Sequence, residues 1–151
     1  MKKAITLATE LIKQFEGCSL IPYLCPAGFW TIGYGSTVSA NGKPVTDLTK
    51  PITWSEADSL LLSTIQDVQK QLARVVTIFV TPQQEAALIS LIYNIGIGNF
   101  GRSTLLKLLN TGQMKQAAEQ FLRWNKSQGQ TLSGLTQRRK AERAVFLGET
   151  P

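Results

Sequence analysis

The sequence predicts an α+β fold that is mainly α, with a small β-hairpin lobe and a helical lobe joined by a long helix. Apolar residues recur at helical spacing over most of the chain after residue 53. Short segments rich in strand-forming residues flank a turn sequence between residues 20 and 32. The 151 residues are 43% hydrophobic, which suits one packed domain. We therefore treat 1–151 as a single domain, with a sheet lobe at about 17–52 and a helical lobe at about 53–151 that includes the N-terminal helix.

The N-terminal segment is expected to form a helix rather than a signal peptide. Residues 1–10 begin with a basic pair, but two threonines and a glutamate interrupt the apolar run and no small-residue cleavage site follows. One helical face carries Leu7, Leu11, Ile12 and Phe15. Gly17 is a residue type at which helices commonly end. Glu16 is therefore a carboxyl at the end of an apolar helix, with one apolar and one open side, a setting suited to a general acid.

Two β-hairpins are expected next. The first joins strands Leu20–Leu24 and Phe29–Ile32 through the turn Cys25–Gly28. The second is indicated by the Asn-Gly dipeptide at 41–42, which favours a two-residue turn and would let the two valines of Val38–Val45 pair.

The remainder of the chain is expected to be helical. Thr53 and Glu56 form a capping-box signature, which opens a helix of about 22 residues, near 33 Å long at about 1.5 Å per residue. Thr81 precedes a proline at the first position of the next helix, which is apolar nearly all round over Ala86–Ile95. Further helices are expected at Thr104–Asn110, Met114–Trp124 and Leu135–Leu147, with a flexible break at Gly96–Gly101 and a loop at Asn125–Gly134. The last helix is basic, with Arg138, Arg139, Lys140 and Arg143.

Composition limits the classes of function. The net charge of +6 favours a polyanionic partner, such as a nucleic acid, a membrane surface or an anionic cell-wall polymer. The chain has no histidine, and no cluster of Cys, Asp and Glu has metal-ligand spacing, so we expect no metal and no cofactor. Cys18 and Cys25 flank a strand and are not expected to form a disulfide. No stretch is long enough to span a membrane.

The hairpin region resembles the active-site hairpin of the phage-type lysozymes, glycoside hydrolase family 24. The resemblance rests on Glu-Gly at 16–17, a Leu-x-x-Tyr strand, and Trp-Thr-Ile-Gly-Tyr-Gly at 30–35. It implies that Glu16 is the general acid and that Thr31 helps to hold the attacking water. The family's second catalytic residue, an Asp, is replaced here by Cys25, and its usual His is replaced by Ser36.

The resemblance continues in the same order through the second half of the chain. The matching segments are Tyr93–Phe100, Ser103–Leu106, Phe121–Trp124 and Gly134–Arg143. It implies a glycan cleft between the two lobes and substrate contacts from Tyr93, Asn94 and Ser103. Arg139 matches an arginine that lies near the catalytic Glu in the family. Core packing for Tyr93, and an ordinary surface charge for Arg139, are the alternatives.

The partner of Glu16 is the open chemical question. Hydrolysis of a glycosidic bond needs an acid and either a base or a nucleophile. No Asp or Glu lies between Gly17 and Thr46. Cys25 could replace the carboxylate as base or nucleophile, it could be a spectator beside Thr31 and Glu16, or the site could bind glycan without cleaving it.

The function implied by the resemblance is that of a muramidase, or endolysin, which cuts the β-1,4 bond between N-acetylmuramic acid and N-acetylglucosamine during phage lysis. The alternatives are a catalytically degenerate protein that binds cell-wall glycan and a membrane-active cationic protein. The family also implies accumulation in the host cytoplasm without a signal peptide and release through a holin. We expect a monomer that contacts peptidoglycan, binds no nucleic acid and does not insert stably into a membrane.

Overall fold

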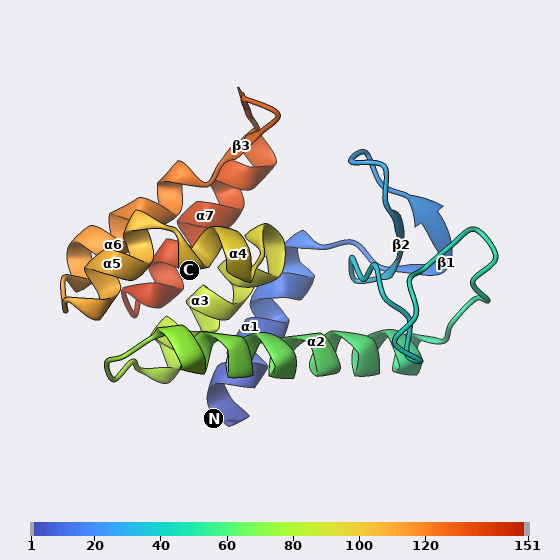
Figure 1. Cartoon of the computed structure of the whole chain (residues 1–151), viewed down its shortest axis with the longest axis horizontal. Coiled ribbons are helices and arrows are strands. Elements are labelled where there is room, and N and C mark those ends of the chain that lie inside the picture. The colour runs from blue at the N-terminus through green and yellow to red at the C-terminus, as the bar shows by residue number, and fades with distance from the viewer. Residues whose placement is uncertain (1, 150–151) are drawn as a thin grey trace. The chain divides into compact units, whose positions relative to one another are not determined.

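The computed structural model of the chain describes residues 2–149. Its contacts divide the chain into two compact units, unit 1 (Met1–Leu11 and Ile65–Pro151) and unit 2 (Ile12–Thr64). Both divisions fall inside helices, the first in α1 (Lys2–Phe15) and the second in α2 (Trp54–Val75), so each of these helices contributes to both units (Figure 1). The fold is α+β and mainly helical, as the sequence predicts.

Unit 2 contains the first hairpin, which confirms the expected strands to within one residue. Strand β1 (Ser19–Leu24) pairs antiparallel with β2 (Trp30–Gly33). The register places Tyr23 opposite Thr31 and is interrupted by an irregularity between Ser19 and Tyr23. The apolar core of this unit is formed by Ile12, Ile32, Val45, Ala57 and Leu61. Each isoleucine or leucine buried in this way contributes about 1.5–3 kcal/mol.

The second hairpin is present, but its register differs from the prediction by one residue. Val38 pairs with Pro44, not with Val45. The Ser39 N–H donates to the Lys43 carbonyl at 2.8 Å, and the Gly42 N–H donates to the Ser39 carbonyl at 2.9 Å. The loop therefore has three residues, with Gly42 at a φ of 81° supplying the left-handed position that three-residue hairpin loops use.

Helices α2 and α3 begin where local sequence signals place their first residues. At α2 the Thr53 hydroxyl accepts from the Glu56 N–H and the Glu56 carboxylate accepts from the Thr53 N–H, which confirms the capping box. Helix α3 (Pro82–Ile95) begins with a second capping box, formed by Thr81 and Gln84. Its residues Ala86–Ile92 are all buried, as expected for a central helix.

Unit 1 builds its core around α3, which packs against α7 (Ser133–Phe146), while α5 packs against α6. Buried side chains from several helices complete the core, including Phe100, Leu105, Leu109, Phe121 and Phe146. The other elements of this unit are α4 (Ile97–Gly101), α5 (Thr104–Asn110), α6 (Met114–Gln120), η1 (Phe121–Arg123), β3 (Lys126–Ser127) and β4 (Gln130–Thr131).

Three expectations about unit 1 require correction. The expected break at Gly96–Gly101 contains the short helix α4, because Gly96 redirects the chain at a φ of 87° and Phe100 is then buried. The expected loop at Asn125–Gly134 contains the β3–β4 hairpin, whose turn places Gln128 and Gly129 at φ 51° and 79°. The helix expected at Met114–Trp124 tightens into the 3-10 turn η1 after Gln120.

Among the described residues, no helix is long and apolar enough to cross a membrane.

Candidate active site

The turn between β1 and β2 brings two of the predicted catalytic residues onto one backbone group. The Cys25 N–H donates to the Phe29 carbonyl at 2.9 Å, and the Thr31 hydroxyl donates to the same carbonyl at 3.0 Å. The Gly28 N–H closes the turn on the Cys25 carbonyl at 2.9 Å, and Gly28 has a φ of 90° that favours glycine. The Phe29 carbonyl therefore fixes Cys25 and Thr31 relative to each other.

The same turn makes the Cys25 thiol more acidic. The backbone N–H of Phe29, followed by those of Ala27 and Gly28 and by the Thr31 hydroxyl, lowers the pKa of Cys25, and this effect outweighs the opposing effect of desolvation. The pKa of Cys18 moves in the other direction, because burial raises it and a hydrogen bond with Tyr34 only partly offsets this. Both thiols are free. Cys25 is thus the more readily ionised of the two, as a nucleophile or base requires.

Glu16 follows the last residue of α1, and its N–H still donates to the Ile12 carbonyl at 2.9 Å. Its carboxylate lies against the backbone of Gly35, where an added Cβ would come within 3.2 Å of Oε2. Gly35 also has a φ of 87°. The second glycine of the Gly-Tyr-Gly sequence therefore lets the chain approach the Glu16 carboxylate closely.

Thr31 is 4% exposed and Ile32 is fully buried, whereas Trp30 is only half-buried. Buried and exposed side chains therefore do not alternate regularly along β2. A buried hydroxyl needs a hydrogen-bond partner, and Thr31 has one in the Phe29 carbonyl. The role of Thr31 in holding water stays a prediction.

Ser36 makes only local contacts among those described. Its hydroxyl donates to the Val38 carbonyl at 2.6 Å, and its backbone pairs with that of Ile32. Ile32 is completely buried. We therefore expect packing, rather than an ion pair at Ser36, to hold the hairpin.

An ion pair links α1 to α2 within unit 2. Lys13 Nζ lies 2.8 Å from Asp58 Oδ1 and 5.1 Å from the centroid of the Tyr34 ring. The hydrogen bond to Asp58 raises the pKa of Lys13. Both partners are substantially exposed, so this pair contributes no more than about 1 kcal/mol.

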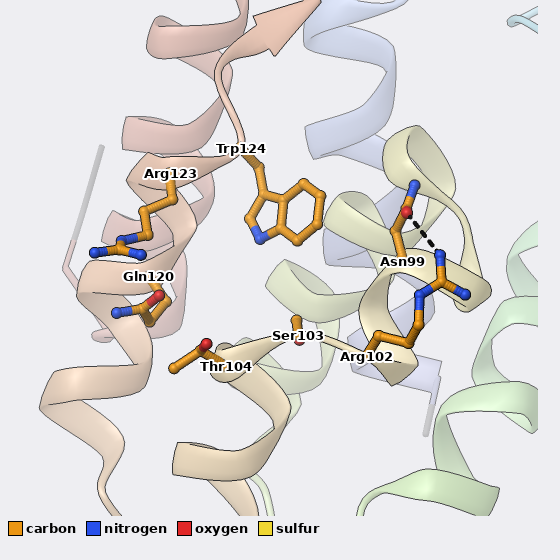
Figure 2. Close-up of a pocket in the computed structure, with 7 residues that line it drawn as sticks. All are labelled: Asn99, Arg102, Ser103, Thr104, Gln120, Arg123 and Trp124. Atoms are coloured by element: carbon orange, nitrogen blue, oxygen red, sulfur yellow. Dashed lines mark hydrogen bonds between the residues drawn. The ribbon is translucent and has the colours of Figure 1, made fainter. Parts of the chain in front are cut away.

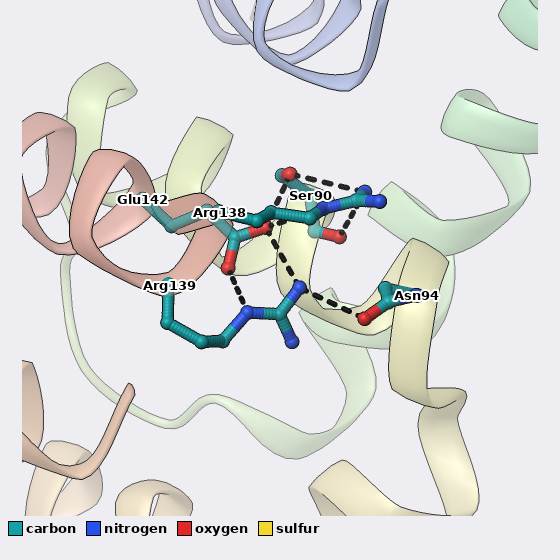
Figure 3. A network of polar contacts seen from close by, with 5 residues as sticks. All are labelled: Ser90, Asn94, Arg138, Arg139 and Glu142. Atoms are coloured by element: carbon teal, nitrogen blue, oxygen red, sulfur yellow. Dashed lines mark hydrogen bonds and ion pairs between the residues drawn. The ribbon is translucent and has the colours of Figure 1, made fainter. Parts of the chain in front are cut away.

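Arg139 is fully buried, which excludes the alternative that it is an ordinary surface charge. It lies in a network between α3 and α7, shown in Figure 3. Its Nε is 2.9 Å from Glu142 Oε1, and its Nη2 donates to Asn94 Oδ1 at 2.9 Å. Arg138 Nε lies 3.2 Å from Glu142 Oε2. The Ser90 hydroxyl donates to the same oxygen at 2.5 Å. Two of the predicted site residues, Arg139 and Asn94, are therefore in direct contact.

The Glu142 carboxylate is the centre of this network. Burial raises the pKa of Glu142, while Arg139, Arg138 and Ser90 act to lower it. The last helix is basic in composition, as expected, but two of its four basic residues are buried against Glu142 inside unit 1. Of the other two, Lys140 is exposed and Arg143 is partly exposed and paired with Glu119.

Ser103 lines a cavity of about 310 Å³ in unit 1, together with Asn99, Arg102, Thr104, Gln120, Arg123 and Trp124 (Figure 2). The Ser103 hydroxyl accepts from the Leu106 N–H at 3.1 Å and donates to the Phe100 carbonyl at 2.7 Å. It therefore caps α5, and one acceptor position on the oxygen is left for a ligand. Tyr93, the remaining predicted contact, is half-buried near the end of α3.

The seven predicted site residues thus fall into two sets. Unit 2 holds Glu16, Cys25 and Thr31, and unit 1 holds Tyr93, Asn94, Ser103 and Arg139. Within the described part of the chain, no group of three or more His, Cys, Asp or Glu side chains could hold a metal ion.

Sequence reasoning missed Tyr23 as a neighbour of the catalytic set. Tyr23 pairs with Thr31 across the hairpin. Its pKa is raised by burial and by the negative charges of Glu16, Cys25 and Cys18. The signal was available, because a hairpin with its turn at Cys25–Gly28 puts Tyr23 and Thr31 on the same face of the two strands.

The chain matches the family described as phage lysozyme over residues 13–142. It is 39% identical over 140 residues to the endolysin of Acyrthosiphon pisum secondary endosymbiont phage 1, covering 90% of this chain and 92% of that protein. It is 37% identical over 150 residues to the SAR-endolysin of Enterobacteria phage P21, covering 95% of this chain and 88% of that protein.

A solved structure of a phage endolysin has the same fold as this chain. The endolysin from Escherichia coli O157:H7 phage FAHEc1 superposes with a TM-score of 0.84 at 33% identity, covering 100% of this chain and 95% of that chain. The chain therefore belongs to the phage lysozyme family, and it is a glycoside hydrolase of the muramidase type.

Proposed function

We propose that this muramidase cleaves the β-1,4 bond between N-acetylmuramic acid and N-acetylglucosamine with Glu16 as general acid and Cys25 as its partner. Glu16 gives its proton to the leaving oxygen. Cys25, as the thiolate, takes a proton from a water molecule whose oxygen attacks the anomeric carbon, and Thr31 helps to hold that water. Inverting glycosidases likewise use one general acid and one general base, but there the base is a second carboxylate, whereas here it is a thiolate.

The observation that carries the proposal is the arrangement of Cys25 and Thr31 around the Phe29 carbonyl. Both residues donate to this carbonyl, at 2.9 and 3.0 Å. The single proton of the Thr31 hydroxyl is donated to the Phe29 carbonyl in this structure and can be donated instead to the Cys25 thiolate. In either case the Thr31 oxygen can accept a hydrogen bond from water. A thiol with a lowered pKa beside that oxygen is suited to deprotonate the water.

The second set of residues is proposed to contact the substrate. Tyr93, Asn94 and Ser103 would bind the glycan, and Arg139 would act through its contact with Asn94. Acidic residues slightly outnumber basic ones in unit 2, so the surplus of positive charge lies in unit 1. This distribution favours attraction of an anionic cell-wall polymer to unit 1.

We further propose that the protein acts as a monomer, without nucleic acid and without stable membrane insertion. It would accumulate in the host cytoplasm and reach the wall after a holin opens the inner membrane. The role in phage lysis on which this proposal rests is supported by a relative that is a phage endolysin. Sedimentation of the pure protein tests the monomer. Fractionation of expressing cells, with and without a co-expressed holin, tests the location.

The experiment that tests the catalytic assignment compares wild type with Glu16→Gln on purified peptidoglycan. The substitution keeps the shape of the side chain and removes the transferable proton. We expect the release of new reducing ends to fall at least about a hundredfold, the usual scale for loss of general-acid help. Glu10→Gln is the matched control, because Glu10 is an exposed carboxylate on the same helix.

Two results would contradict the assignment. Release by Glu16→Gln within about threefold of wild type would show that Glu16 makes no contribution specific to the transition state. A wild-type protein that binds peptidoglycan but releases no reducing ends would instead support the degenerate alternative.

A further inference from the structure

One face of the β1–β2 hairpin carries two of the proposed reacting groups together with two aromatic rings. The register pairs Tyr23 with Thr31. Two residues further towards the turn, Cys25 lies opposite Phe29, because the Cys25 N–H donates to the Phe29 carbonyl at 2.9 Å. Paired residues of antiparallel strands share a face, and side chains two apart along a strand share it too. The four side chains of these two pairs therefore lie on the same face.

Phe29 combines a fixed backbone with an exposed ring. Its carbonyl accepts the Cys25 N–H at 2.9 Å and the Thr31 hydroxyl at 3.0 Å. Its side chain is nevertheless 62% exposed, and the Tyr23 side chain beside it on this face is 39% exposed. Burial of a phenylalanine is strongly favourable, and most of this ring is left in water. Phe29 thus presents an apolar surface directly beside the residues proposed to react.

The groups on this face match the chemistry of a sugar ring. A pyranose carries hydroxyl groups around its rim and apolar C–H groups on its two faces. The face of an aromatic ring is electron-rich and attracts such weakly positive C–H groups. Ligand sites usually combine aromatic side chains with a few polar groups that set the orientation, and here the Thr31 hydroxyl and the Cys25 thiol lie beside the Phe29 ring.

An exposed aromatic ring can also stack on a nucleic-acid base. Binding of nucleic acid depends on a surplus of positive charge to neutralise the phosphates. In unit 2 acidic residues slightly outnumber basic ones. The charge of this unit therefore favours an uncharged sugar ring over a nucleotide on this face.

We propose that the Phe29 ring is a substrate-binding surface on which a sugar ring next to the bond to be cleaved stacks. The inference rests on the proposed function, from which it takes the substrate and the roles of Cys25 and Thr31. The Phe29 carbonyl holds these two residues, and the Phe29 ring holds the sugar against them. Because the contact is present in both the bound substrate and the transition state, it contributes to substrate binding more than to the chemical step.

Leu24 provides a matched control on the same hairpin. It pairs with Trp30 and so lies on the opposite face from Phe29. It is 56% exposed, nearly as much as Phe29. Leu24→Ala therefore removes exposed apolar surface beside Cys25 without touching the proposed binding face. Phe29→Leu keeps apolar bulk but removes the aromatic ring, and every variant at this position keeps the backbone carbonyl.

The experiment measures by calorimetry the binding of a soluble tetrasaccharide of alternating N-acetylglucosamine and N-acetylmuramic acid, in a Glu16→Gln background that slows its hydrolysis. We expect Phe29→Ala and Phe29→Leu to raise the Kd about five- to tenfold relative to this parent. Phe29→Trp and Leu24→Ala should stay within about twofold. With Glu16 intact, Phe29→Ala should raise KM on peptidoglycan by a similar factor and leave kcat unchanged. Thermal melting checks that each variant is folded.

The outcomes separate this inference from the proposed function. Weaker binding by both Phe29→Ala and Phe29→Leu, with unchanged binding by Leu24→Ala, supports the inference. An unchanged Kd in Phe29→Ala overturns it. A loss in Phe29→Ala but not in Phe29→Leu also overturns it, since apolar bulk would then suffice, and so does an equal loss in Leu24→Ala. Because binding is measured without the general acid, the roles of Glu16 and Cys25 are judged separately, by the activities of their own variants.

Discussion

Substitution of Glu142 by glutamine should destabilise the protein strongly. Glu142 is completely buried and binds Arg138, Arg139 and Ser90. Glu142→Gln keeps the size of the side chain but removes the negative charge that lies against two buried guanidinium groups (Figure 3). Breaking a buried ion pair by removing one partner costs about 3–5 kcal/mol.

This loss is large enough to measure in two ways. For a chain of this size each 1 kcal/mol lowers the melting temperature by about 2–4 °C, so we expect a decrease of about 6–20 °C. Urea denaturation, followed by far-UV circular dichroism, should show the same loss as a lower midpoint with an unchanged slope. Glu119→Gln is the matched control, because Glu119 also binds an arginine of α7, Arg143, but 56% of its side chain is exposed. That variant should lose no more than about 1 kcal/mol.

Equal losses in the two variants would refute the reasoning. In that case the buried network would be no more stabilising than a surface pair. A triple replacement of Arg138, Arg139 and Glu142 by methionine, methionine and leucine provides a further check. Because it removes all three charges together, it should recover most of the stability lost in Glu142→Gln.

Two further predictions concern unit 2. At pH 8 iodoacetamide should alkylate Cys25 faster than Cys18, because the pKa of Cys25 is lowered and that of Cys18 is raised, and peptide mapping should show the difference disappear in urea. Gly35→Ala should slow lysis by about tenfold or more, since its Cβ would come within 3.2 Å of Glu16 Oε2 and displace the carboxylate. Gly42 is the control, because its φ is also positive but an added Cβ would meet no atom within 4 Å. Gly42→Ala should therefore lower the stability by about 1–2 kcal/mol and keep the activity. Equal lysis rates in the two variants would contradict the role of Gly35.

The elements that the sequence predicted well are those with local signals. The capping box of Thr53 and Glu56 is an example, since it needs only residues three apart in the chain. The buried arginines could not be predicted in this way. From the sequence, Arg138 is one of several charges on a basic helix and a surface charge is one of two readings of Arg139; only the packing of α7 on α3 shows both arginines buried against Glu142. Their burial is a consequence of tertiary contacts that no spacing along α7 reveals.

The same distinction holds for the candidate site. The position of Glu16 at the end of a helix could be read from apolar spacing and the following glycine. The link between Cys25 and Thr31 could not, because it passes through the carbonyl of Phe29, a backbone group that every residue carries. The small β3–β4 hairpin was missed because Gln128, not a glycine, occupies one of its left-handed positions.

The central claim is that Cys25 replaces a carboxylate as the partner of Glu16. It is tested most directly by the initial rate at which wild type, Cys25→Ser and Cys25→Asp clear a suspension of purified peptidoglycan. We expect Cys25→Ser, which keeps the size and removes the thiolate, to be at least about a hundredfold slower than wild type. Cys25→Asp should be at least as fast as wild type, because it restores a pair of carboxyl groups. If Cys25→Ser clears the suspension as fast as wild type, the thiol is a spectator and the account of the site is wrong.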